Sequence, residues 1–401
     1  MPLSVLARPL AALAEGLQAP GTAEGYFVDD LLSLARRHLK SFLEISLERE
    51  LTAYLGCGSH VRTTGRTDYR NGYYTRDLAT GLGLLQDLRV PRSRKGGFQP
   101  SLFARYERRK REVDQSIQAL FFAGVSTRGV AEVLELLWGY APSASTVSAV
   151  VAQLDAEVKA FHQRDLGDEY VYLFLDGLTV TLKELPTAKK RLVLVASGIT
   201  SDGRRVLLDY QVAASESTTE WERFLLRLQR RGLLGRHLRL ITTDGGKGLR
   251  AALPLVYAEI PHQLCWVHKL RNVAQYLKRS QEVACLAQAQ EIYRARHKKA
   301  FRAAWNDWKS RWEGEAPAAV ACLAADLEAL STYLQCPPEH HRLIRTTNYI
   351  ERLMRELRRR TRPMGAFADR SSCDRLFYGV VRRVNKNWST KQPLPGFTHK
   401  P

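Results

Sequence analysis

The first repeating pattern of apolar and polar residues covers residues 29–55, where apolar side chains recur three or four positions apart. This spacing predicts a long helix with one apolar face, and Gly56 marks its end. Residues 61–111 change to short strand-like runs interrupted by glycines. The change predicts hairpins or an extended segment instead of a second helix.

Helical periodicity returns in three short segments, 113–123, 127–138 and 144–158, the last preceded by Ser143 as a capping residue. Three short helices in a row are typical of a helix-turn-helix, although such triplets also occur as plain packing units. If this unit reads DNA, the candidates for base contact stand at the start of its third helix: Ser145, Thr146 and Ser148.

Apolar residues then alternate with period two, which predicts strands at 170–175, 178–182, 192–200 and 205–213. A helix at 218–230, a strand at 238–243, a short helix and an apolar run at 259–267 follow. Strands mixed with helices in this way predict an α/β domain.

From about residue 269 to residue 340 the pattern is helical again. Trp305, Trp308 and Trp312 in this segment are spaced to share one helical face. A tryptophan stripe of this kind is far more often part of a core than a ligand site.

Positive charge is concentrated in two parts of the chain. The 401 residues include 61 Lys and Arg against 41 Asp and Glu, a net charge of +20. Residues 61–111 have 13 basic and 4 acidic side chains, and residues 352–386 have 11 and 3. Such concentration favours contact with a phosphate backbone, where each neutralised phosphate releases counterions, over the alternative of a solvated charged surface. In the first segment the DNA-contact candidates are Arg70, Arg92, Arg94 and Lys95.

Several classes of protein are disfavoured. The six cysteines are scattered, with no C-x-x-C pair, as expected of reduced thiols. The N-terminal stretch is mildly apolar, but Pro2, Arg8 and Pro9 interrupt it, so it resembles neither a signal peptide nor a membrane helix. No later stretch approaches the roughly 18 apolar residues of a membrane span. We expect a cytoplasmic protein that associates with the bacterial nucleoid and has no membrane partner.

Three motifs occur in a fixed order, TTDGGKGL, HQLCWVHKLRNV and TTNYIERLMRELRRRTRPMGAF, after the segments DYRNGYYTRDLATGLG, VPRSRKGGFQP, GVSTRGVAEVLELLWG and SASTVS. Together they resemble the bacterial branch of the Mutator-type insertion-sequence transposases, from about Leu31 to Trp388. The resemblance implies an α/β ribonuclease H-like catalytic core with a helical insertion. A mostly helical DNA-binding region with a helix-turn-helix would precede that core.

The resemblance also implies a DDE triad: Asp176 in YLFLDGLTV, Asp244 in ITTDGG and Glu351 in TNYIER. Asp176 stands at the end of the first strand run, and Asp244 ends a later strand that the family places beside the first. Three carboxylates suit Mg²⁺ or Mn²⁺, which prefer oxygen ligands. Two such ions can activate the attacking oxygen and stabilise the leaving oxygen of an in-line displacement at phosphorus.

Each triad residue also has a plain structural interpretation. Asp176-Gly177 between two strand runs is a hairpin-turn pattern. Asp244 could simply end a strand, and Glu351 could pair with Arg355 on a helix surface.

Cys265 and His268 form a C-x-x-H element that resembles the family's signature after the second aspartate. Zinc needs about four ligands, and only His262 stands nearby as a third, so we expect a structural or DNA-proximal role near the active site. A buried thiol beside a hydrogen-bonded histidine is the plain alternative.

Five arginines follow Glu351 in the same predicted helix and could reach the DNA backbone, although five cannot share one face. The fifth is Arg360. The DNA-contact candidates among them are Arg352, Arg355, Arg358 and Arg359.

We therefore predict an N-terminal helix with a basic DNA-contacting region (1–111), a helix-turn-helix domain (112–160), a catalytic domain (161–390) with a helical insertion at about 269–340, and a tail (391–401). The expected protein is a transposase that binds terminal inverted repeats, cleaves double-stranded DNA there and joins the ends to target DNA. It would act as a homodimer or higher oligomer on DNA. The alternatives are a ribonuclease H-like nuclease or resolvase, and a catalytically idle DNA-binding protein.

Overall fold

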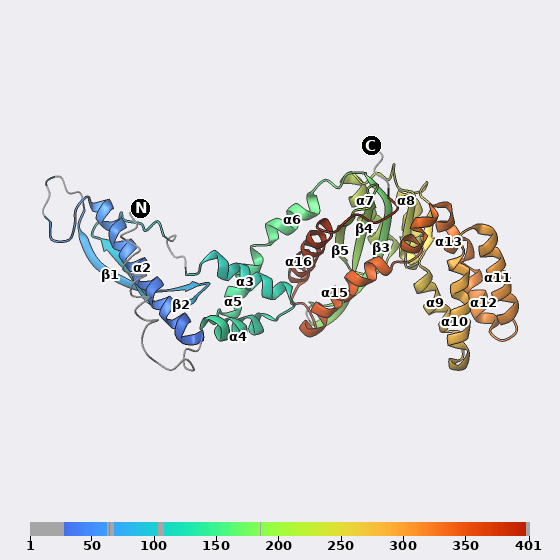
Figure 1. Ribbon diagram of the computed structural model, residues 1–401, viewed down its shortest axis with the longest axis horizontal. Coiled ribbons are helices and arrows are strands. Elements are labelled where there is room, and N and C mark those ends of the chain that lie inside the picture. The colour runs from blue at the N-terminus through green and yellow to red at the C-terminus, as the bar shows by residue number, and fades with distance from the viewer. Residues whose placement is uncertain (1–27, 62–63, 65–67, 103–107, 185, 398–401) are drawn as a thin grey trace. The chain divides into compact units, whose positions relative to one another are not determined.

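The computed structural model describes residues 28–61, 64, 68–102, 108–184 and 186–397 (Figure 1). The chain divides into two compact units, the first made of residues 1–121 with 125–151 and the second of residues 122–124 with 152–401. The N-terminal residues considered above for a signal peptide or membrane helix lie outside the described residues.

In the first unit a long helix packs on a two-stranded hairpin. Helix α2 (Val28–Leu55) confirms the first predicted helix, and β1 (Arg70–Thr80) pairs antiparallel with β2 (Gly83–Ser93), which confirms the predicted hairpin. The core between them contains Leu47, Leu78 and Leu88, each fully buried. The hairpin thus shares a small apolar core with α2, which gives its basic side chains a fixed frame.

Four helices follow: α3 (Arg111–Phe122), α4 (Thr127–Trp138), α5 (Ala144–Ala152) and α6 (Asp155–Gln163). The bounds of α4 agree with the sequence pattern because both ends are encoded locally. The Ser126 hydroxyl accepts the Gly129 N–H at 3.1 Å, and Gly139 ends the helix at a φ of 63°, which glycine adopts without strain.

The single helix predicted at 144–158 is wrong, because the structure has two helices, α5 and α6. The cause is a set of contacts with a distant part of the chain. Asp155 receives two hydrogen bonds from Arg375 at 2.6 and 2.7 Å, and Glu157 receives the Tyr378 hydroxyl and Arg382. These contacts hold α6 against the C-terminal helix α16 (Arg370–Ser389). The apolar periodicity of residues 144–158 could not predict them, because it contains no information on distant residues.

The second unit is built on a mixed five-stranded sheet of order β5-β4-β3-β6-β7. Strands β5, β4 and β3 pair antiparallel with one another, and β6 and β7 run parallel to β3. The strands are β3 (Tyr170–Glu184), β4 (Thr187–Thr200), β5 (Arg205–Ala213), β6 (Leu240–Thr243) and β7 (His262–Leu264). The expectation of an α/β protein is confirmed at this level.

Strand β3 is continuous, so the two runs predicted at 170–175 and 178–182 form one strand and Asp176 stands in its middle. Asp176 pairs with Val195, which excludes the hairpin-turn interpretation of Asp176-Gly177. Gly177 serves close packing instead, since a Cβ there would meet the Leu192 side chain at 3.1 Å.

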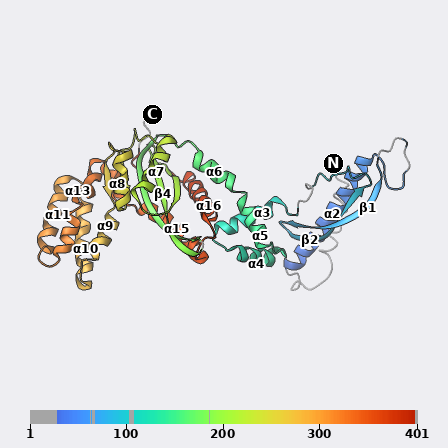
Figure 2. The same cartoon turned by 180° about the vertical axis from the view of Figure 1, so that it is seen from behind.

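Helices cover both faces of the sheet. Helices α7 (Thr218–Arg230) and α8 (Lys247–Val256) bury Trp221, Phe224 and Leu249 against Leu173 and Leu175. Because side chains alternate along a strand, Tyr172, Phe174 and Asp176 point to the opposite face. Figures 1 and 2 show α15 (Asn348–Met364) and α16 beside the sheet, where α15 contacts β3 and α16 contacts β5.

A helical segment separates β7 from α15, as the sequence predicts, and Figure 2 shows its helices grouped at one end of this unit. Trp308 and Trp312 are buried in it, and Trp308 donates to the Cys285 carbonyl at 3.0 Å, so these two are core residues. The segment consists of α9 (Trp266–Ala274), α10 (Arg279–Arg294), α11 (Lys298–Trp312), α12 (Pro317–Ala324), α13 (Leu327–Ser331), two 3₁₀ turns (Thr332–Gln335, Pro338–His340) and α14 (His341–Ile344).

All six cysteines are free thiols. Across the ranges that the structure describes, no helix combines the length and apolar character needed to span a membrane.

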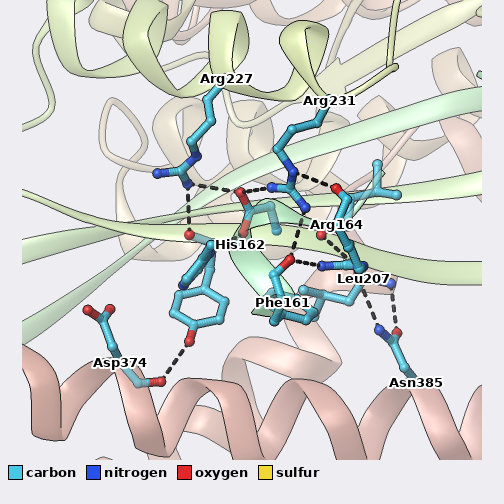
Figure 3. Close-up of polar contacts among 11 residues, drawn as sticks. Phe161, His162, Arg164, Leu207, Arg227, Arg231, Asp374 and Asn385 are labelled. Carbon is cyan, nitrogen blue, oxygen red and sulfur yellow. Dashed lines mark hydrogen bonds and ion pairs between the residues drawn. The ribbon is translucent and has the colours of Figure 1, made fainter. Parts of the chain in front are cut away.

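A buried ion cluster joins α6 to the sheet and to α7 (Figure 3). Asp209 of β5 is fully buried, and its carboxylate is contacted by His162 Nδ1 at 2.7 Å, Arg227 at 2.9 Å and Arg231 at 2.7 Å. Burial alone would raise the pKa of Asp209, but the bond to His162 and the two guanidinium charges hold this pKa below its ordinary value. Asp209 is therefore ionised at neutral pH and compensates two partly buried cations.

We predict that Asp209→Asn lowers the free energy of unfolding by about 3 to 5 kcal/mol at pH 7, because it leaves the two arginines without their counter-charge. A depressed native pKa contributes stability above the unfolded pKa of about 3.9, and this contribution is lost as the pH falls. The deficit should therefore shrink toward pH 3. Chemical denaturation tests this, with Asp307→Asn at an exposed position of α11 as the control. Equal stability of the Asp209 variant and wild type at pH 7 would contradict it.

Candidate active site

Asp176 is a buried carboxylate on the sheet face that is turned away from α7 and α8. Only 5% of the residue is exposed, and its Oδ1 accepts the Gly177 N–H at 2.7 Å. Burial, and next the charge of Asp244, raise the pKa of Asp176 to about 7, with a smaller contribution from Glu351 in the same direction. Asp244 and Glu351 are therefore close enough to act electrostatically on Asp176.

Asp244 follows β6, which lies parallel beside β3 as the family resemblance implies. Leu175 and Thr243 are register partners, so Asp176 and Asp244 are the next residues on two neighbouring strands. The Asp244 Oδ1 accepts the Gly246 N–H at 3.1 Å. Parallel pairing of the two strands thus brings together two residues that are far apart in sequence.

Glu351 comes from the first turn of α15. Its Oε1 lies 2.9 Å from Arg271 of α9 and 4.0 Å from His268 Nε2. The ion partner of Glu351 is therefore Arg271, and the suggested helix-surface pair with Arg355 is not what the structure shows.

The C-x-x-H element holds the start of the helix that carries Glu351. The Cys265 Sγ accepts the Thr347 N–H at 3.2 Å and the Thr347 hydroxyl at 3.3 Å, and that hydroxyl also lies 3.3 Å from His268 Nδ1. Thr347 is fully buried and is the N-terminal cap residue of α15. Cys265 and His268 thus fix the backbone four residues before Glu351.

His262, the third residue considered for zinc, has a separate contact. Its Nε2 lies 2.8 Å from the Thr243 hydroxyl, directly before Asp244. Burial lowers the pKa of His262 to about 4, so its imidazole is neutral at physiological pH. The contact of His262 with Thr243 holds the end of β6 in place.

The donor set suits Mg²⁺ or Mn²⁺ in its chemistry, because carboxylate oxygens are the ligands these ions prefer and a cation would relieve the repulsion on Asp176. Among the described residues, however, no three His, Cys, Asp or Glu side chains lie close enough together to hold one ion. Glu351 is held by Arg271, and it would have to leave this partner for all three carboxylates to share an ion.

The basic stretch of α15 has two kinds of arginine. Arg355, Arg358 and Arg359 are exposed, whereas the side chain of Arg352 lies outside the described residues. Arg360 is buried and donates to the Phe122 carbonyl at 2.9 Å and to Glu356, so it has a structural role. Its function could not be read from composition, because it depends on a chain segment more than 200 positions away.

A hollow of about 770 Å³ lies in the first unit, and we call it the hairpin hollow. Two of the predicted DNA contacts, Arg92 and Thr146, line it. The sequence analysis missed further basic and aromatic lining residues: Arg76, Arg108, Tyr74 and Tyr140. The alternation of aromatic and basic residues in DYRNGYYTRD was the available signal for the first segment.

The other candidates for DNA contact in the first unit do not line the hairpin hollow. Arg70 is held by Glu48 at 2.7 Å and by Thr52, which ties the hairpin to α2. Arg94 and Lys95 are exposed after β2. At α5, the hydroxyls of Ser145 and Thr146 lie 2.8 and 2.9 Å from that of Ser143, and Ser148 is exposed.

A mixed sheet with converging carboxylates and a basic N-terminal part agrees with the family that the motifs resemble. The chain belongs to the Mutator family of transposases, whose family model, "Transposase, Mutator family", matches residues 15–391.

Curated relatives cover most of the chain. The sequence is 36% identical over 370 residues to the transposase for insertion sequence element ISRM5 of Rhizobium meliloti strain 1021, covering 92% of each chain. It is 32% identical to the transposase for IS256 in transposon Tn4001 of Staphylococcus aureus, over 85% of this chain and 87% of the relative. A simian T-cell lymphotropic virus intasome structure in complex with PP2A regulatory subunit B56 gamma covers 52% of this chain and 63% of that chain at 12% identity. Its TM-score of 0.18 carries no structural argument.

We predict that Asp176→Asn stabilises the metal-free protein at pH 8. The native pKa of about 7 lies above the ordinary aspartate value of 3.8, so the native state holds this proton more tightly than the unfolded chain does. The protein therefore loses stability as the pH rises between these two values. Removing the charge should raise the free energy of unfolding by up to about 4 kcal/mol at pH 8 in EDTA, and by little at pH 4. Denaturant titrations at both pH values test this, and a variant that is less stable than wild type at pH 8 would contradict it.

Proposed function

We propose that the protein binds the terminal inverted repeats of an insertion sequence, cleaves DNA at the element ends and joins the 3′ ends to target DNA. The observation that supports this most directly is the convergence of Asp176, Asp244 and Glu351 in a member of the Mutator transposase family. The sheet, with antiparallel strands continued by parallel β6 and β7, is consistent with a ribonuclease H-like core.

In this proposal Asp176, Asp244 and Glu351 bind Mg²⁺ or Mn²⁺. When bound, such ions supply activation of the attacking oxygen and stabilisation of the leaving oxygen in phosphodiester chemistry. In the metal-free protein Glu351 is paired with Arg271, and in this proposal it leaves Arg271 when it binds the metal ion. Cys265 and His268 position α15 through Thr347. Their proposed role is therefore structural, near the active site.

Exposed arginines on α15 can contact the DNA backbone close to the carboxylates. Arg358 acts electrostatically on Asp176, so a phosphate near Asp176 would also be within reach of its charge. Arg355 and Arg359 are exposed on the same helix. Arg352 belongs to the same proposal by its position in the sequence.

The first unit supplies further backbone contacts in this proposal. The hairpin hollow combines arginines with aromatic rings, a composition suited to phosphates and bases. Arg70, Arg94, Lys95, Ser145 and Ser148 are proposed contacts around it, with α3, α4 and α5 as the helix-turn-helix. Because joining requires two element ends at once, we propose a homodimer or higher oligomer on double-stranded DNA in the bacterial cytoplasm.

The triad prediction is that Asp176→Ala, Asp244→Ala and Glu351→Gln each abolish cleavage and joining of terminal-repeat DNA in Mg²⁺. Repeat binding should persist, since other residues make the proposed phosphate contacts. Oligonucleotide cleavage and strand-transfer assays, together with gel-shift titrations, measure both properties. Asp307→Ala is a matched loss of an exposed carboxylate and should leave cleavage, joining and repeat binding unchanged.

The same assays distinguish the remaining functions. Cut but unjoined products would identify a nuclease or resolvase, and DNA binding without products would identify an idle DNA-binding protein. If any one triad variant joins DNA at the wild-type rate, that residue is not a metal ligand.

For the hairpin hollow, we predict that Arg92→Ala and Arg108→Ala each weaken binding of repeat DNA by about tenfold at moderate salt. Each should also make the dependence of log affinity on log salt shallower by about one, because one phosphate is no longer neutralised. Arg49→Ala removes the same charge from an exposed position of α2 outside the hollow and serves as the control. Equally weakened binding in all three variants would show that the hollow has no special role.

A further inference from the structure

Glu216 brings a fourth carboxylate to Asp244. It lies directly before Ser217, the cap residue of α7, on the connection that leaves β5. A Cβ placed on Gly246 would lie 1.9 Å from Glu216 Oε1 and 3.5 Å from Asp244 Oδ1. The two carboxylates, 28 positions apart in sequence, therefore border the same point beside Gly246.

Two glycines of the DGGKG sequence make this approach possible. Gly246 has φ −52° and ψ 138°, a conformation open to any residue, so backbone freedom does not explain it. Gly248 is helical, and a Cβ there would meet the Glu216 carbonyl oxygen at 2.4 Å. Both glycines leave space for the segment around Glu216 to lie against the residues that follow Asp244.

This placement has an electrostatic cost in the metal-free protein. Glu216 Oε1 and Asp244 Oδ1 lie 1.9 and 3.5 Å from the same point beside Gly246, so the two carboxylates repel each other when both are ionised. Within the described part of the chain, the structure gives the Glu216 carboxylate no hydrogen-bond donor and no basic partner. Asp244 in turn follows β6, whose Thr243 pairs with Leu175 of β3, so it also stands beside the buried carboxylate of Asp176. A cation between these groups would offset the repulsion that their packing creates.

We propose that Glu216 is a fourth carboxylate of the catalytic centre and binds, together with Asp244, a divalent cation. This inference rests on the metal-dependent activity proposed above and extends its ligand set. Mg²⁺ and Mn²⁺ accept several carboxylate oxygens and retain water, so a fourth acidic side chain suits either ion. It also provides an acidic ligand while Glu351 stays paired with Arg271.

The test is a titration of Mn²⁺ into the full-length, DNA-free protein, with free Mn²⁺ followed by electron paramagnetic resonance. Glu216→Gln should weaken the tightest Mn²⁺ site by about tenfold or more, at least the effect of removing an outer partner of a metal ligand. Glu222→Gln removes the same charge from α7 away from Gly246 and should bind Mn²⁺ as wild type does. Thermal unfolding in EDTA checks that each variant is folded.

Gly246→Ala tests the geometry while keeping every carboxylate. Its backbone angles accept alanine, and the clash is with the flexible end of the Glu216 side chain, so the fold should be retained. The methyl group should displace Glu216 and weaken Mn²⁺ binding to a similar extent. Because both changes act through one carboxylate, the double variant Glu216→Gln, Gly246→Ala should bind no more weakly than the weaker single variant.

Asp244→Asn separates failure of this inference from failure of the proposed function. If Asp244→Asn loses Mn²⁺ while Glu216→Gln binds as wild type does, Glu216 is not a ligand and the proposed triad stands. If Asp244→Asn also binds as wild type does, both the metal centre and the role of Glu216 are wrong. Weakened binding in both variants, with Glu222→Gln unchanged, supports the inference.

Discussion

The buried position of Asp176 beside Asp244 is the constraint on which the rest of the second unit depends. Burial, and next the charge of Asp244 directly after the neighbouring parallel strand, raise the pKa of Asp176, so this position of Asp176 has an electrostatic cost. The surroundings hold them there nevertheless. His262 braces the end of β6, and the bonds from Thr347 to Cys265 and His268 fix the helix that presents Glu351. The site thus gives up stability for an arrangement that suits a cation.

Stability for that arrangement comes from elsewhere in the unit. The apolar layer under α7 and α8 fills one face of the sheet. The ion cluster around the fully buried carboxylate of Asp209 ties α6, β5 and α7 together. At the far end of α15, Arg360 bonds to the Phe122 carbonyl, so the helix that carries Glu351 is held at both its start and its end. A helix fixed in this way can present a carboxylate with little freedom.

Features with local causes could be predicted from the sequence. The bounds of α4, β5 and α7 follow from caps and periodicity, and the ordered motifs identified the family. The break between α5 and α6, the continuity of β3 through Asp176 and the burial of Arg360 were not predictable, because each depends on partners distant in sequence. Glu216 was overlooked for the same reason: nothing around it marks the approach to Gly246. The triad residues were located by motif, and their metal-binding role remains a proposal.

We propose above all that the carboxylates of this unit form a centre for divalent cations that acts on DNA. The most direct measurement is anomalous X-ray scattering from Mn²⁺ in crystals of the protein bound to terminal-repeat DNA. We expect a Mn²⁺ peak with oxygen ligands from Asp176 and Asp244, next to a DNA phosphate. A DNA-bound complex that contains Mn²⁺ only at other positions, with Asp176 and Asp244 unliganded, would contradict it.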